Sequence, residues 1–190
     1  MTLENSFAGF RNTSFDAIAA LSLTKIISAK EKAFFVAVCT NAENTAKHIL
    51  KEFKLSKNIN DGDFQWLMRL YVSICIMELY DLFDHVRRGA DDRLKSVLDV
   101  NREQAVDHFK RILGGDDIEK FSEITLKFIE SLDKESKDLD EYMIKRTAFI
   151  FKSFQDGGVS APLVKNLDVQ KISNEVYRNS LMNFVALCVR

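Results

Sequence analysis

Turn-forming residues are scarce in this chain, which has 7 glycines and 1 proline among 190 residues. In an average protein these two types make up roughly 12% of the residues. A β-sandwich or β-barrel needs a turn about every 8 to 12 residues, and glycine and proline form many of those turns. The sequence therefore predicts an all-α fold.

The composition is that of a folded domain. Hydrophobic residues make up 46% of the chain and charged residues 29%, which is enough apolar material for one substantial core. No linker, low-complexity tract or internal repeat divides the chain. We therefore expect a single helical domain over residues 1–190.

The charge and the cysteines exclude several classes of protein. The formal net charge is −1 at pH 7, so the chain lacks the basic excess that drives nucleic-acid binding. Four basic residues near a predicted helix end are interpreted as complementing the helix dipole: Arg87, Arg88, Arg93 and Lys95. The three cysteines are far apart in apolar stretches and show no zinc-ligand spacing, so we expect them in the core.

The chain start and the hydropathy predict a soluble cytoplasmic protein. Residues 1–11 lack the cationic start and apolar run of a secretory signal. The most apolar runs, Leu70–Met77 and Leu181–Val189, are much shorter than the roughly 20 residues that span a bilayer. We expect no membrane span.

Apolar residues spaced by three and four predict about seven helices. The segment Phe64–Arg88 is apolar on most of its circumference, which is typical of a helix at the centre of a bundle. The other segments begin after Asn12–Ser14, near Phe35, at Asn101, at Asp116, at Leu139 and at Asp168.

Several local signals set helix ends and faces. Asn101 with Gln104, and Asp116 with Glu119, match capping boxes. In the second helix the stripe from Phe35 to Phe53 predicts one buried face, with the opposite face in solvent: Glu43, Lys47, His48, Lys51 and Glu52.

Glu78 is the residue of greatest chemical interest. Successive residues of a helix are about 100° apart, which places Glu78 in the widest apolar stripe of the central helix, beside Asp81 and in line with His85. Arg69, Ser73 and Tyr80 fall on the opposite, polar side. A buried carboxylate must be paired, hydrogen-bonded or protonated.

One hypothesis for Glu78 is structural. The same construction places Arg146 in the apolar stripe of the helix that begins at Leu139. Opposite charges in two apolar stripes predict an ion pair between Glu78 and Arg146 across the core.

The alternative hypothesis groups Glu78, Asp81 and His85 as metal ligands or as an acid–base cluster in a pocket. No Glu-x-x-His pair of the di-iron type occurs in the chain, so no metal ligand or cofactor is assigned. Asp81 and His85 also fit a simple charge pair four residues apart. His108 is expected at the edge of the core.

Aromatic residues are numerous, with 15 phenylalanines. Five aromatic residues are hard to bury in a simple bundle and suggest a groove, a dimer face or an apolar ligand site: Phe7, Phe10, Phe15, Phe34 and Trp66.

Three classes of function remain open. The leading hypothesis is a non-enzymatic helical module that binds a protein partner or a second copy of itself, through the N-terminal segment or the C-terminal helix. The alternative is an enzyme or small-molecule binder with a pocket around Glu78. A third is a helical transcription regulator, because the first 60 residues hold eight basic and five acidic side chains.

Overall fold

The computed structural model describes residues 2–87, 100–114, 116–163 and 165–188, without the side chains of 84–87, 116–123, 133, 166 and 167. Over these residues the chain forms seven α-helices and one 3-10 helix and no strand, which confirms the predicted all-α bundle. The elements are α1 (Leu3–Leu23), α2 (Ala29–Glu52), η1 (Asp61–Asp63), α3 (Phe64–Arg87), α5 (Arg102–Leu113), α6 (Asp116–Glu135), α7 (Leu139–Asp156) and α8 (Asn166–Cys188).

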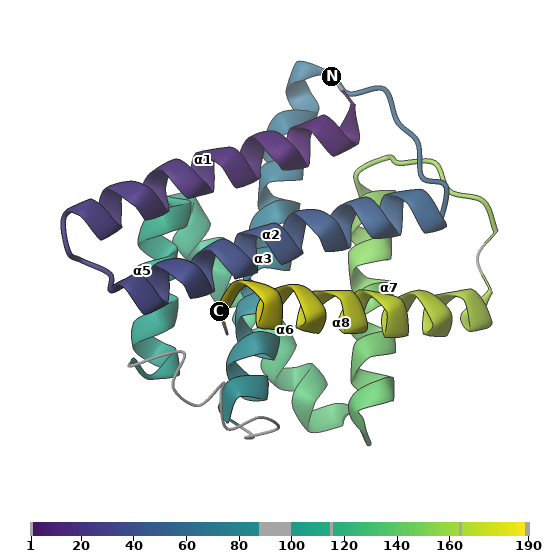
Figure 1. The fold of residues 1–190 in the computed structure, drawn as a ribbon. Helices are drawn as coiled ribbons and strands as arrows, with labels where there is room; N and C mark the ends of the chain where they lie inside the picture. The colour runs from purple at the N-terminus through teal and green to yellow at the C-terminus, as the bar shows by residue number, and fades with distance from the viewer. Residues whose placement is uncertain (1, 88–99, 115, 164, 189–190) are drawn as a thin grey trace.

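The helices form two layers. Figure 1 shows α1, α2 and α8 side by side across one face, with α3, α5, α6 and α7 crossing behind them. The single-domain interpretation of residues 1–190 stays a prediction. None of the described helices is both long enough and apolar enough to cross a membrane.

The helix α3 is the central helix, as predicted. It contacts each of the other six α-helices, and every residue from Leu70 to Tyr80 is buried. The side expected to be polar is covered too: Ser73 Oγ lies 3.2 Å from Thr125 Oγ1 of α6, and the Arg102 guanidinium lies over the ring of Tyr80. The prediction of a polar side was wrong for these two residues because α6 packs over Ser73 and α5 over Tyr80.

The helix α1 begins ten residues earlier than the sequence predicts. Thr2 is its N-cap, and Thr2 Oγ1 accepts a hydrogen bond from the backbone N–H of Asn5 at 3.2 Å. The earlier start places Phe7 and Phe10 in the core, where their rings meet edge-on. Of the other aromatic residues expected to be left over, Phe34 is buried and Phe15 and Trp66 are half-buried.

The helix α2 is enclosed on more than one face, which corrects the prediction of a single buried face. It packs against α1, α3 and α8, and its buried residues include Glu31, Asn41 and Glu43. A capping box that the sequence analysis did not identify, formed by Ser28 and Glu31, begins this helix.

Other helix ends follow the predicted signals. Asn101 and Gln104 form the predicted capping box, and Gly114, with φ of 69°, ends α5. After α7, Gly157 packs directly beneath Trp66, where a Cβ atom would lie 1.9 Å from the indole ring. This close approach requires glycine.

The cysteines are free thiols. Cys39 of α2 and Cys75 of α3 are buried, and Cys188 in the last turn of α8 is half-buried. Burial raises the pKa of Cys75 well above its ordinary value and raises the pKa of Cys188 to about 12.

Some predicted features lie outside the described residues. These are the basic residues Arg88, Arg93 and Lys95, the side chains of Arg87 and His85, and the capping box of Asp116 and Glu119.

Candidate functional site

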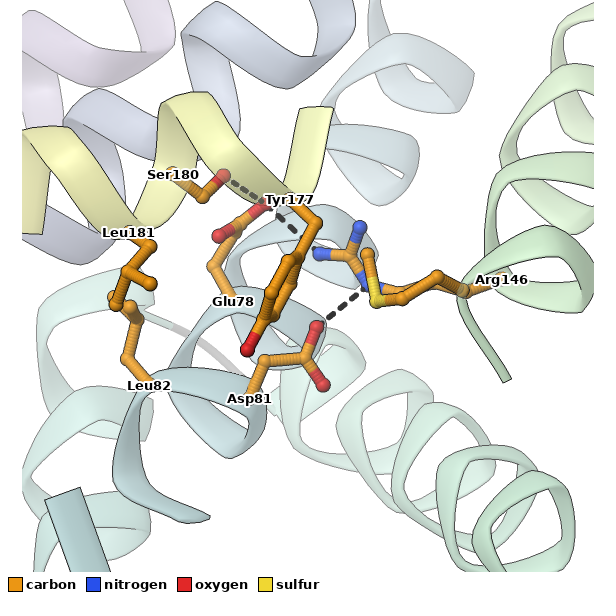
Figure 2. A pocket seen from close by; sticks show the side chains of 8 residues that line it. Glu78, Asp81, Leu82, Arg146, Tyr177, Ser180 and Leu181 are labelled. Atoms are coloured by element: carbon orange, nitrogen blue, oxygen red, sulfur yellow. Dashed lines mark hydrogen bonds and ion pairs between the residues drawn. The ribbon is translucent and has the colours of Figure 1, made fainter. Parts of the chain in front are cut away.

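Glu78 lies at the point where four helices meet. Its side chain projects from α3 and is 2% exposed. One oxygen, Oε1, accepts three hydrogen bonds: from Thr45 Oγ1 of α2 at 2.8 Å, from Arg146 Nη2 of α7 at 2.8 Å and from Ser180 Oγ of α8 at 3.4 Å. Figure 2 shows the carboxylate between α8 and the guanidinium. The contact predicted between Glu78 and Arg146 is therefore confirmed.

Arg146 also contacts a second carboxylate. Its Nε lies 2.9 Å from Asp81 Oδ2, and Asp81 Oδ1 accepts a 2.6 Å hydrogen bond from the hydroxyl of Tyr142. Because Asp81 is one helical turn from Glu78, both carboxylates reach the same guanidinium. The cluster is thus two acids around one arginine, where the sequence analysis expected a pair.

The electrostatics of the cluster keep the guanidinium charged. The side chain of Arg146 is 1% exposed, and this burial lowers its pKa. The charges of Asp81 and Glu78 raise it by more, so the pKa of Arg146 lies above its ordinary value. Among the described residues, its Nη1 has no hydrogen-bond partner. An unsatisfied buried donor of this kind costs stability.

The cavity beside the cluster is very small. It has a volume of about 10 Å³ and is lined by eight residues: Glu78, Asp81, Leu82, Met143, Arg146, Tyr177, Ser180 and Leu181. That volume is at the lower limit for one water molecule. Small-molecule pockets usually have at least roughly 300 Å³. In this conformation the cluster has no room for an organic substrate.

The arrangement is suited to joining helices. Each carboxylate is already contacted by the guanidinium and by at least one hydroxyl, so a cation at either acid would compete with Arg146. Within the described residues, no group of three or more His, Cys, Asp or Glu side chains is placed to bind a metal ion. The alternative hypothesis also includes His85, whose side chain lies outside the described part of the structure.

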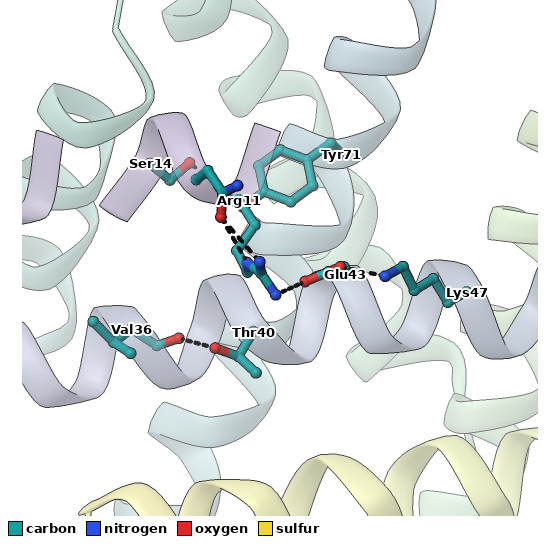
Figure 3. A network of polar contacts seen from close by, with 8 residues as sticks. Arg11, Ser14, Val36, Thr40, Glu43, Lys47 and Tyr71 are labelled. Carbon is teal, nitrogen blue, oxygen red and sulfur yellow. Dashed lines mark hydrogen bonds and ion pairs between the residues drawn. The ribbon is translucent and has the colours of Figure 1, made fainter. Parts of the chain in front are cut away.

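A second buried acid, Glu43, was missed by the sequence analysis. Figure 3 shows its carboxylate between Arg11 of α1 and Lys47 of α2. The side chain of Glu43 is 2% exposed, whereas those of Arg11 and Lys47 are 30% and 38% exposed. The periodicity of α2 placed Glu43 in solvent, because it did not show that α1 covers that side.

The histidines with described side chains also contact acids. His48 is half-buried, and its Nε2 lies 3.2 Å from Glu175 Oε2 of α8. The prediction that it would be solvated was therefore wrong. His108 Nδ1 lies 2.6 Å from Oε1 of the buried Glu31, which agrees with the expected place at the edge of the core.

Comparisons of this chain with protein-family models, with curated proteins and with solved structures find no match. The contacts and cavities described above are therefore the basis for the functional proposals.

Proposed function

We propose that this protein is a non-enzymatic helical module that binds a protein partner through the outer face of α8, and that this partner is a second copy of the chain. The outer face consists of Met182, Val185 and Ala186, which are three and four residues apart and so share one side of the helix. Met182 is 66% exposed, Ala186 is exposed and Val185 is half-buried. Exposed apolar side chains in a row on one helix are typical of interaction surfaces.

The choice between the two predicted interaction faces follows from burial. The N-terminal segment uses Phe7 and Phe10 in the protein's own core, so those side chains are not available to a partner. The outer face of α8 lies in solvent at the front of the bundle (Figure 1). This difference is the observation that carries the proposal.

A cytoplasmic location is part of the proposal. Three cysteines remain free thiols, two of them buried in the core. A reducing compartment preserves this state.

Light scattering coupled to gel filtration, over a concentration range of about 5 to 500 µM, tests the proposal. We expect a dimer with a dissociation constant on the order of 10 to 100 µM, because a face this small buries less area than the roughly 1,200 Å² of stable complexes. Met182→Lys should weaken the dimer by about tenfold or more, since it buries a charge in an apolar contact.

Leu163→Lys is the matched control, because Leu163 is a fully solvated leucine in the loop before α8. It should leave the dissociation constant unchanged. A wild-type protein that stays monomeric up to 500 µM would contradict the second-copy proposal. Equal weakening by the two variants would show that charge alone, and not the α8 face, controls association.

The alternative function places an enzyme or metal site at Glu78, Asp81 and His85. The cavity of about 10 Å³ and the contacts of Arg146 with both acids give it less support than the α8 face. A thermal-shift screen with divalent cations distinguishes the two, because a ligand that binds only the folded state raises its melting temperature. A saturable rise that Asp81→Asn abolishes would favour the alternative.

A further inference from the structure

A polar groove runs between α2 and α8 on the outer face of the bundle. Its volume is about 360 Å³, within the range of roughly 300 to 1,000 Å³ typical of small-molecule sites. Most of its lining side chains can form hydrogen bonds. Figure 1 shows the two helices that form its walls lying next to each other.

Three asparagines in this groove have unused hydrogen-bonding capacity. Asn44 of α2 and Asn179 and Asn183 of α8 line the groove from helix interiors, where asparagine is a poor helix former. Within the described part of the chain, none of their carboxamides forms a hydrogen bond. By contrast, Nδ2 of the buried Asn41 donates to the carbonyl of Ser180 at 3.0 Å. Asn44 and Asn179 are exposed and Asn183 is half-buried, so their carboxamides are open to a ligand in the groove.

Positive charge is concentrated on the α2 wall of the groove, whereas Glu4 of α1 brings a carboxylate to its lining. Lys47 and Lys51 are one turn apart and both line it, with His48 between them. Lys47 shares Glu43 with Arg11, so two cations surround that one carboxylate. Lys51 is exposed and has no ion-pair partner among the described residues. The wall therefore presents an ammonium group that is not neutralised internally.

A larger hollow of about 470 Å³ lies beside Leu50 and Leu55, but it lacks this feature. Its lysine, Lys57, already donates to Asp63 Oδ1 at 2.6 Å and to the carbonyl of Gly157. The α2–α8 groove thus offers ligand-binding groups that the larger hollow does not.

We propose that the α2–α8 groove binds a small polar molecule that carries an oxyanion, either a phosphate or a carboxylate. The ammonium of Lys51 and the N–H groups of the three carboxamides would donate to the oxyanion, and the carboxamide oxygens would accept from its hydroxyl or amino groups. The proposal does not rest on the proposed dimer, but the two sites adjoin, because Met182 of the dimer face also lines this groove.

The floor of the groove joins it to the buried charge cluster. Thr45 and Ser180 line the groove, and their hydroxyls donate to Glu78 Oε1. A ligand that contacts both α2 and α8 would therefore also stabilise the packing of the two helices that supply these hydroxyls.

Titration of the protein with inorganic phosphate tests the proposal. The ionic strength is kept constant at pH 7.5 with sodium chloride, and the side-chain amide signals of Asn44, Asn179 and Asn183 are followed by ¹⁵N–¹H NMR. We expect saturable shifts of these signals with a dissociation constant in the millimolar range, since phosphate supplies only the oxyanion part of the ligand. A carboxylate probe, citrate, distinguishes the two sources of oxyanion.

Two pairs of variants separate the groove from general surface effects. Lys51→Gln should weaken phosphate binding about fivefold or more, because it removes a charge-assisted hydrogen bond. Lys152→Gln, at an exposed site on α7, should change it less than about 1.5-fold. Asn179→Ala should weaken binding about two- to threefold, whereas Asn174→Ala, at an exposed position of α8 outside the groove, should not.

Saturable shifts lost in Lys51→Gln and retained in Lys152→Gln would support the site. The proposal is overturned if neither phosphate nor citrate gives saturable shifts at these three amides. It is also overturned if chloride alone reproduces the shifts, or if each groove variant binds phosphate as tightly as its control.

Discussion

Glu78 and Glu43 are equally buried acids on neighbouring helices, but their cations differ in exposure. Both carboxylate side chains are 2% exposed. Glu78 meets Arg146, which is 1% exposed, whereas Glu43 meets Arg11 and Lys47, which are 30% and 38% exposed. The burial of an acid therefore does not by itself determine its energetics. The solvation of its partner decides how much its loss costs and how strongly salt screens it.

The largest effect is expected for Arg146→Met. This change leaves the buried Glu78 and the half-buried Asp81 without their shared cation, so we expect a loss of about 3 to 5 kcal/mol in the free energy of unfolding. Urea denaturation followed by circular dichroism measures it. Lys152→Met on the exposed side of α7 is the control and should cost less than about 0.5 kcal/mol. A loss below about 1 kcal/mol for Arg146→Met would show that the cluster contributes no more than a surface pair.

A smaller effect is expected for Glu78→Gln. Arg146 keeps its contact with Asp81, and the glutamine oxygen can still accept from Thr45, so we expect a loss of about 2 kcal/mol. In a double-mutant cycle with Arg146→Met, the coupling between the two residues should be at least about 1 kcal/mol. Simple additivity of the two changes would contradict the ion pair. Because Asp81 remains, the double variant should recover only part of the lost stability.

Glu43 should respond less to mutation than Glu78 and more to salt. Glu43→Gln should cost about 1 kcal/mol at 0.05 M sodium chloride, and roughly half of that at 1 M, because its cations are partly solvated. The cost of Glu78→Gln should change little over the same range. Glu52→Gln, at an exposed position of α2, is the control. Equal salt dependence for the two buried acids would remove the distinction between them.

The smallest effects are expected when a hydroxyl that donates to Glu78 is removed. Thr45→Val removes a 2.8 Å hydrogen bond to Glu78 and should cost about 1 kcal/mol, whereas Ser180→Ala removes a 3.4 Å contact and should cost about half as much. Thermal unfolding in parallel with the wild type resolves the two. The reverse order would indicate that α8 is held to the cluster more tightly than the distances show.

The sequence predicted the contact between Glu78 and Arg146 because residue spacing fixes which side of a helix each residue occupies. The phase of Glu78 on α3 and of Arg146 on α7 follows from counting residues, and their burial leaves few partners other than each other. The hydroxyl partners Thr45, Ser180 and Tyr142 were not predicted. Such contacts depend on how helices are placed relative to one another, and the spacing of residues within a single helix does not determine that.

The error at Glu43 follows from the wrong start of the first helix. The cap residues Asn12–Ser14 were interpreted as the start of the first helix, but Thr2 caps it instead. The additional turns carry Arg11 across α2 and cover the side of Glu43. Because the predicted first helix began ten residues too late, the side of α2 that carries Glu43 was predicted to be exposed. The burial of that side depends on the length of α1.

The three thiols can report unfolding of different parts of the protein. Cys39 and Cys75 are sealed between α2 and α3, while Cys188 lies half-buried at the end of α8. A thiol reagent can modify the first two only when these inner helices separate, whereas fraying of the last turn exposes the third. The modification rates of Cys39 and Cys75 would therefore measure the separation of α2 and α3, and the rate of Cys188 would measure fraying of α8. No engineered probe is needed.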